Sequence, residues 1–174
     1  MIHKLTMPLA DDDINSINIK DTVLLSGKIY TGRDAAHKRM IEMLDNGEKL
    51  PFDIQGQAIY YTGPCPEKDG MPIGSCGPTT SYRMDAYTPR LLNIGLKVMI
   101  GKGNRSEKVV QAMVENNAIY LAATGGAGAL LASCVKSAKV IAFDDLLSEA
   151  VRELIVLDMP LICAIDSKGN SLFK

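Results

Sequence analysis

Short apolar stretches that alternate with stretches of helical periodicity are the feature that most constrains how this chain can fold. Residues 21–30 have the composition of a strand, and residues 36–44 then place apolar side chains on one face of a helix. The alternation recurs where the apolar residues 97–100 precede the helical pattern of residues 109–114. Strands that alternate with helices predict an α/β fold, in which strand-to-helix junctions gather at the carboxyl ends of the strands.

The remaining elements are predicted from the same patterns. A bulge is expected at Gly27, and a helix that follows residue 81 is expected to kink or split at Pro89. Residues 62–78 are rich in glycine and proline, which is typical of a functional loop or lid. The Gly/Ala run at 122–130 lacks the G-x-G-x-x-G spacing, so it indicates tight helix packing or, alternatively, ligand contact. An acidic turn is expected at 11–13, and further strands at 5–9, 58–61, 118–121, 138–142, 154–157 and 161–165.

The composition is that of an ordinary globular protein. A length of 174 residues suits a single domain, 1–174, with 47% hydrophobic and 22% charged residues. A net charge of −1 predicts no general attraction to nucleic acid or to anionic membranes. The chain has no run of about eighteen apolar residues and is acidic early, at residues 11–13, so neither a membrane span nor a signal peptide is expected.

Cysteine and histidine positions argue against a metal centre within the chain. The cysteines form neither a Cys-x-x-Cys pair nor a zinc-like spacing: Cys65, Cys76, Cys134 and Cys163. Free thiols in a reducing cytoplasm are therefore expected. The only histidines are His3 and His37. No metal ligands are predicted, and Cys76 and His37 are interpreted as buried packing residues.

Residues 77–85, Gly-Pro-Thr-Thr-Ser-Tyr-Arg-Met-Asp, carry the strongest functional signal. A helix that begins near Thr80 would bring backbone N–H groups together with the hydroxyls of Thr79 and Thr80. The guanidinium of Arg83 would lie at the same place, and this combination suits an anion. The alternative is that Thr80 merely caps a helix, while Arg83 pairs with Asp85 or with solvent.

Two further cations lie at strand-to-helix junctions. Arg33 follows the strand at 21–30 and starts a helix, where the helix dipole disfavours a cation unless an anion shares the site. Lys102 lies between two glycines after residues 97–100; this is no Walker A loop, but glycines let a ligand approach the backbone. Together with Arg83, these residues predict a small ligand with at least two negative groups. Since no acid–base pair or metal ligand set accompanies them, the chain is expected to supply half of an active site.

Residues 77–85 resemble the signature of the C-terminal (β) region of the iron–sulfur-dependent class I fumarase/L-tartrate dehydratase family. Residues 31–37, 101–104 and 165–170 are similar to family segments in the same order, and the resemblance covers residues 5–173. It implies a swivelling β/β/α domain, a mixed sheet or part-barrel with helices packed on one side. A free-standing chain of this length is similar to the β subunit of the two-subunit form.

The resemblance implies reversible dehydration of (S)-malate to fumarate by a cytoplasmic hetero-oligomer. The partner α subunit would carry the three cysteines that hold a [4Fe–4S] cluster, so none is expected on this chain. Arg33, Arg83 and Lys102 would hold the carboxylates of a small dicarboxylate substrate. Thr80 would add a hydrogen bond, and Thr79 matches the threonine proposed as catalytic base; an alcohol needs nearby cations for that role. The alternatives are an L-tartrate dehydratase β subunit and a non-catalytic dicarboxylate-binding subunit.

Overall fold

The structure is a computed structural model that describes residues 1–123 and 127–173. Its strands are β1 Ile2–Thr6, β2 Thr22–Thr31, β3 Ala58–Tyr60, β4 Val98–Gly101, β5 Ile119–Ala122, β6 Val135–Ala142 and β7 Val151–Ile165. Its α-helices are α1 Asp11–Ser16, α2 Asp34–Asp45, α3 Thr88–Asn93, α4 Glu107–Asn116 and α5 Gly128–Ser133. Two 3-10 helices are η1 Ser81–Met84 and η2 Asp144–Glu149.

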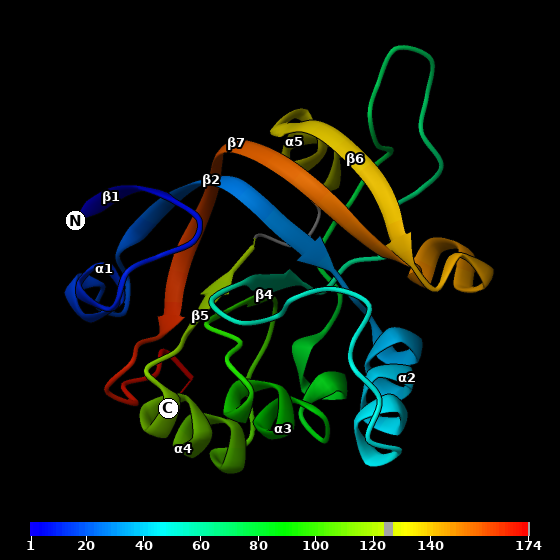
Figure 1. Cartoon of the computed structure of the whole chain (residues 1–174). Helices are drawn as coiled ribbons and strands as arrows, with labels where there is room; N and C mark the ends of the chain where they lie inside the picture. Colours follow the sequence, from blue (N-terminus) through cyan, green and yellow to red (C-terminus); the bar gives the residue numbers. More distant parts are fainter. Residues whose placement is uncertain (124–126, 174) are drawn as a thin grey trace.

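These strands form one sheet that closes on itself. Their order is β1-β2-β3-β4-β5-β7-β6, and β2 also pairs with β7, so that β2, β3, β4, β5 and β7 form a barrel. The strands β2 to β5 run parallel, whereas β7 is antiparallel to both of its barrel neighbours. Figure 1 shows α2, α3 and α4 below the barrel, with α5 above it near β6. The predicted α/β fold, a part-barrel with helices packed alongside, is confirmed.

Two apolar layers hold this arrangement together because successive strand residues point to opposite faces. In β4, Val98 and Ile100 belong to the cluster inside the barrel, while Met99 belongs to the cluster under the helices. In β5, Leu121 lies inside and Tyr120 lies under the helices. Both faces of these strands are therefore buried, which explains why the sequence shows them as continuous apolar runs.

The N-terminal prediction is wrong in position. The opening strand is β1, paired with β2 from Ile2 to Thr6, rather than residues 5–9. Pro8, which has no N–H to donate, is the second residue after the end of the strand. Residues 11–13 are the first turn of α1 rather than an isolated turn, because carboxylates interact favourably with the amino end of a helix.

The two C-terminal strands expected at 154–157 and 161–165 are one strand, β7. It continues because it pairs along its length with β6, β2 and β5 in turn. Pro160 is exposed and lies opposite Leu24 of β2, and Asp158, with φ 48°, marks the irregularity between the two predicted segments. Cross-strand pairing has therefore outweighed the local signal of a proline.

Other local predictions are confirmed. The register of β2 against β7 shifts between Leu25 and Gly27, and Gly27 has φ 99°, as expected for a bulge. The helix predicted at 36–44 is α2, which ends before Asn46. Residues 62–78 form a long connection, and neither helix nor strand interrupts it.

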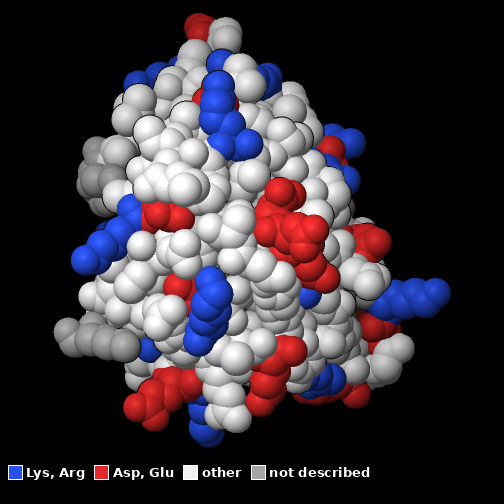
Figure 2. Space-filling model, turned by 90° about the vertical axis from the view of Figure 1, so that its left-hand side faces the viewer, with Lys and Arg blue, Asp and Glu red and all other residues white. Residues whose placement is uncertain are grey.

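The surface carries both signs of charge. Figure 2 shows acidic and basic side chains interspersed among uncharged ones on the face that it presents. Across the described residues, every helix is too short or too polar to span a membrane.

Candidate functional site

The carboxyl ends of β2, β3 and β4 lie side by side, because these strands are parallel neighbours in the barrel. Thr31, the last residue of β2, is paired with Tyr60, and Tyr60 is paired with Ile100. Arg33 follows the end of β2 by two residues, and Lys102 follows β4 directly. Two of the three predicted cations thus leave the same rim of the barrel.

The segment at 77–85 joins this rim through its backbone. The N–H of Thr79 donates to the carbonyl of Tyr61 at 2.7 Å, and the N–H of Ser81 donates to the carbonyl of Lys102 at 2.9 Å. Thr80 forms an isolated parallel bridge with Lys102. The structure therefore brings the two threonines next to the ends of β3 and β4, with Thr79 half-buried and both Thr80 and Lys102 exposed.

The helix expected to begin near Thr80 is much shorter than predicted. It is the single 3-10 turn η1, and α3 begins separately with Pro89 in its first turn, so the predicted split is confirmed. Thr80 occupies the N-cap position of η1, but its side chain makes no capping hydrogen bond. The alternative in which Thr80 merely caps a helix is therefore wrong. The first N–H of η1 already donates to the carbonyl of Lys102, so this N–H does not contribute to an anion site.

Arg83 is paired with Asp34 at the start of α2. Its Nε donates to one carboxylate oxygen and its Nη2 to the other, each at 2.9 Å. The interpretation that Arg83 pairs with Asp85 is wrong, because Asp85 accepts a hydrogen bond from the buried Arg105 instead. The pair shows that the planar fork of Arg83 is oriented toward a carboxylate. It also ties the third predicted cation to the segment that carries Arg33.

Arg33 occupies the N-cap of α2 in an extended conformation. Its side chain lies on Gly63: a Cβ at that glycine would be 2.8 Å from Nη1 and 2.9 Å from Cδ. Among the described residues, its buried Nε has no hydrogen-bond partner. The N–H of Ala35 already donates to the carboxylate of Glu149 at 3.2 Å. The carboxylate of Glu149 therefore lies at this helix start, and the binding of an anionic ligand by Arg33 stays a prediction.

His37 is completely buried beneath this junction. Its Nδ1 lies 2.8 Å from the carbonyl oxygen of Arg33, and its ring meets the edge of the Tyr61 ring with centroids 5.4 Å apart. Burial lowers the pKa of His37 to about 4. The interpretation of His37 as a helix-face residue that packs against the sheet is confirmed.

A buried polar cluster around Arg105 was not predicted from the sequence. Its Nε donates to Asp85 at 2.6 Å, and its Nη2 donates to the hydroxyls of Thr88 at 3.0 Å and Tyr61 at 3.2 Å. Its guanidinium carbon lies 4.9 Å from the centre of the Tyr120 ring. The available signal was weak: Asp85 ends the functional segment, and Arg105 follows Lys102 by three residues within a polar stretch.

A second hydrogen-bonded chain joins the segment that carries Thr80 to the loop that carries Lys102. The hydroxyl of Tyr120 donates to the carbonyl of Gly103 at 2.8 Å and lies 2.7 Å from the hydroxyl of Ser81. Burial raises the pKa of Tyr120 to about 12, so the phenol keeps its proton. A Cβ at Gly101 would overlap the hydroxyl of Ser81, which explains the close approach of the two segments.

The chain's own residues do not fit the [4Fe–4S] cluster that the family resemblance implies. Over residues 1–123 and 127–173, no three His, Cys, Asp or Glu side chains gather as a metal site would require. Burial raises the pKa of Cys76 to about 11 and that of Cys163 to about 12, whereas a metal ligand must be a thiolate. The interpretation of Cys76 as a buried residue is confirmed.

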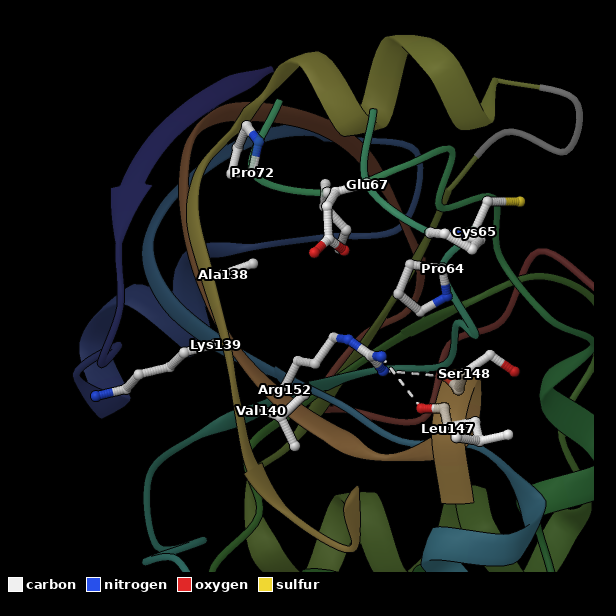
Figure 3. Close-up of a pocket in the computed structure, with 12 residues that line it drawn as sticks. Pro64, Cys65, Glu67, Pro72, Ala138, Lys139, Val140, Leu147, Ser148 and Arg152 are labelled. Atoms are coloured by element: carbon white, nitrogen blue, oxygen red, sulfur yellow. Dashed lines mark hydrogen bonds between the residues drawn. The ribbon is translucent and has the colours of Figure 1, made fainter. Parts of the chain in front are cut away.

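A separate cavity of about 420 Å³ lies between residues 62–78 and the β6–β7 hairpin. Figure 3 shows Glu67 and Arg152 directed into it, while Arg152 donates to the carbonyls of Leu147 and Ser148. The five predicted site residues do not line this cavity.

The Gly/Ala run at 122–130 lies partly outside the described residues, at 124–126. Gly128 is described and packs tightly: a Cβ there would overlap the hydroxyl of Ser75 and lie 3.0 Å from the nitrogen of Gly77. At this position the run makes the close packing that was predicted.

Comparison with known proteins shows the family to which the chain belongs. The model of the Fumarase C-terminus family matches residues 2–174. A protein of Methanocaldococcus jannaschii named "Putative L(+)-tartrate dehydratase subunit beta" is 41% identical over 95% of this chain and 88% of its own length. The aerobic class I fumarate hydratase of Escherichia coli K12 is 41% identical over 86% of this chain. The mitochondrial fumarate hydratase 1 of Leishmania major is 37% identical over 97% of this chain.

The chain spans less than a third of the two fumarate hydratases, 28% and 31% of their lengths, but most of the tartrate dehydratase subunit. The range matched by the family model, residues 2–174, contains the strand ends and the segments that carry Arg33, Arg83 and Lys102. The chain belongs to the Fumarase C-terminus family.

Proposed function

We propose that this chain is the β subunit of a hydro-lyase that interconverts (S)-malate and fumarate plus water. It supplies carboxylate-binding residues to a site shared with an α subunit. The observation that carries the proposal is the common rim, where the ends of β2 and β4 present Arg33 and Lys102 and the segment at 77–85 lies between them. Family membership supports the hydro-lyase chemistry.

The rim suits a small diacid because it offers separate cationic groups for two carboxylates. Arg83 already presents a two-point fork, which Asp34 occupies in this structure. A substrate carboxylate binds the third nitrogen of the same guanidinium, Nη1, while Asp34 continues to accept from Nε and Nη2. Arg33 and Lys102 hold the second carboxylate, and the exposed Thr80 adds a hydrogen bond. The bound diacid then lies across the ends of three strands.

Thr79 is the proposed base that removes the proton from the carbon beside a carboxylate. It is half-buried, and its N–H is fixed on the carbonyl of Tyr61, so its backbone is held in place. An alkoxide forms near neutral pH only when cations stabilise it, and the cations of the rim provide that charge. We propose that the [4Fe–4S] cluster of these enzymes is held by the α subunit, since this chain's residues do not fit it.

The second candidate is an L-tartrate dehydratase β subunit. The observation in its favour is that the chain matches 88% of the length of a protein with that name, against 28% of the Escherichia coli fumarate hydratase. Tartrate differs from malate by one hydroxyl, so the same carboxylate-binding groups serve both acids. Both candidates share the hetero-oligomeric assembly and a cytoplasmic location, for which the free thiols are suited.

Anaerobic co-expression with a cluster-bearing partner tests the proposal. The reconstituted complex should convert (S)-malate to fumarate, measured by ultraviolet absorbance of fumarate, and this chain alone should have no activity. Turnover of L-tartrate in preference to malate would select the second candidate. A complex that turns over neither acid but binds both would indicate a non-catalytic dicarboxylate-binding subunit and would reject the hydro-lyase readings.

A further inference from the structure

The protonation of His37 follows from its surroundings. The side chain is wholly buried, and burial keeps the ring neutral at neutral pH, so that one ring nitrogen carries a hydrogen. Because the carbonyl oxygen of Arg33 can only accept, the nitrogen 2.8 Å from it, Nδ1, is the donor. Nε2 is then a buried acceptor, and the described residues offer it no hydrogen-bond partner. Within the part of the chain that the structure describes, the hydrogen bond of the ring is therefore the one to the carbonyl of Arg33.

The carbonyl of Arg33 accepts two hydrogen bonds from the same residue. The backbone N–H of His37 donates to it at 2.9 Å, which any residue at this position of a helix provides. The ring N–H adds a second bond at 2.8 Å that depends on the histidine side chain. Tyr61 lies against the ring on one side, and a Cβ at Gly32 would be 3.4 Å from Cε1. The ring has little room to turn, so it pins the peptide that joins Arg33 to Asp34.

That peptide connects two of the proposed carboxylate-binding groups. On its amino side is Arg33, whose side chain lies on Gly63. On its carboxyl side is Asp34, which holds the fork of Arg83 at two points. We infer that His37 is a positioning residue that fixes both arginines against the substrate by donating its Nδ1–H to the carbonyl of Arg33. This inference rests on the proposed function and goes beyond it by assigning His37 a role in substrate binding.

Three substitutions of His37 separate the effect of the Nδ1–H donor from the effect of side-chain size. His37→Asn places an amide N–H near the position of Nδ1, and His37→Leu has nearly the same branched shape without a donor. His37→Gln keeps an amide but extends it toward the position of Nε2. In the complex reconstituted with the cluster-bearing partner, the Asn variant should keep KM for malate within about threefold of wild type. The Gln and Leu variants should raise KM roughly tenfold, as expected for one lost hydrogen bond of ordinary strength.

The expected effect is on KM rather than on kcat, since a carboxylate contact made equally in ground and transition states changes binding alone. A purely structural role would lower the fraction of active enzyme, so that kcat per subunit falls while KM stays constant. Should the Leu variant not fold, the Asn and Gln variants still decide the matter. Equal KM for Asn and Gln, or a loss confined to kcat, would overturn the inference. An inactive wild-type complex would instead reject the proposed function, and the two failures are thereby distinguished.

Discussion

Asp34 and Arg83, 49 residues apart in the chain, form a two-point ion pair in which Nε and Nη2 each lie 2.9 Å from a carboxylate oxygen. Their side chains are 36% and 47% exposed. An ion pair this exposed is worth less than about 1 kcal/mol of folding free energy, because water and salt screen it. The pair therefore orients Arg83 without being needed for the fold.

Replacing Arg83 should affect activity far more than stability. In the reconstituted complex, Arg83→Ala should lower kcat/KM by roughly a hundredfold or more, since charged hydrogen bonds to a substrate carboxylate are lost. The free energy of unfolding, measured in urea, should change by less than about 1 kcal/mol. Arg83→Lys is the control, because it keeps the charge without the fork and should lose less activity. Comparable losses of activity and stability in the Ala variant would mark a structural arginine.

A methyl group on Gly63 should displace Arg33. The Cβ of Gly63→Ala would be 2.8 Å from Nη1 of Arg33, and the flexible guanidinium can move away without unfolding the chain. We expect KM for malate to rise roughly tenfold, as for one lost hydrogen bond. Gly77→Ala is the matched control in the same loop, because its Cβ would meet only ordinary contacts at 3.7 Å and beyond. Steady-state kinetics in which the two variants behave alike would contradict the placement of Arg33.

The buried pair of Arg105 and Asp85 should contribute strongly to stability. Their side chains are 0% and 7% exposed, so Arg105→Met leaves a carboxylate buried without its cation. Breaking such a pair by removing one partner costs about 3–5 kcal/mol, measurable as a lower midpoint of urea denaturation. The control is Arg39→Met, which removes an exposed pair with Asp145 and should leave the midpoint unchanged. A small effect at Arg105 would show that water reaches this cluster.

Stability should fall as the pH is lowered from about 6.5 toward about 4, because of His37. Burial is the main cause of its lowered pKa, and Arg105 lowers it further, while the hydrogen bond to the carbonyl of Arg33 and the charge of Asp34 act in the opposite direction. Since the unfolded chain takes up this proton first, the free energy of unfolding decreases by up to about 1.4 kcal/mol per pH unit in this window.

Urea denaturation at pH 7, 6 and 5 measures this dependence. His37→Asn should flatten it, because an amide does not titrate. The N–H of Asn18 is the main cause that lowers the pKa of Asp21 to about 2. Asp21 therefore affects the pH dependence of stability only below about pH 4, equally in the wild type and in His37→Asn. Parallel pH profiles for wild type and variant would exclude His37 as the titrating group.

The sequence was sufficient for features that depend on local periodicity or on the order of parallel strands. Continuous apolar runs marked β4 and β5, strand-like composition marked β2, and the change of period after residue 31 marked α2. The bulge at Gly27 followed from a residue that tolerates positive φ. Neighbouring parallel strands must end at the same rim, so the adjacency of the segments that carry Arg33 and Lys102 could be foreseen.

The ion-pair partners of side chains and the lengths of helices and strands depend on tertiary contacts, which local sequence patterns do not reveal. Arg83 and Asp85 are two residues apart, yet each pairs with a residue brought in by another segment, Asp34 and Arg105. The helix at Ser81 has a single turn, and its first N–H donates to the carbonyl of Lys102, a contact that no local pattern contains. Likewise β7 passes through Pro160, because flanking strands pair with it on both sides of that residue.

The antiparallel pairing of β2 with β7 has a consequence for the evolution of such a protein. This pairing closes the barrel. The carboxyl ends of the parallel strands therefore cannot move apart unless a row of backbone hydrogen bonds is broken. The closed barrel therefore sets the distances between the strand ends, while the connections that follow the strands supply the substrate-binding side chains. New acids can be accommodated by exchanging those connections, and the framework beneath them need not be rebuilt.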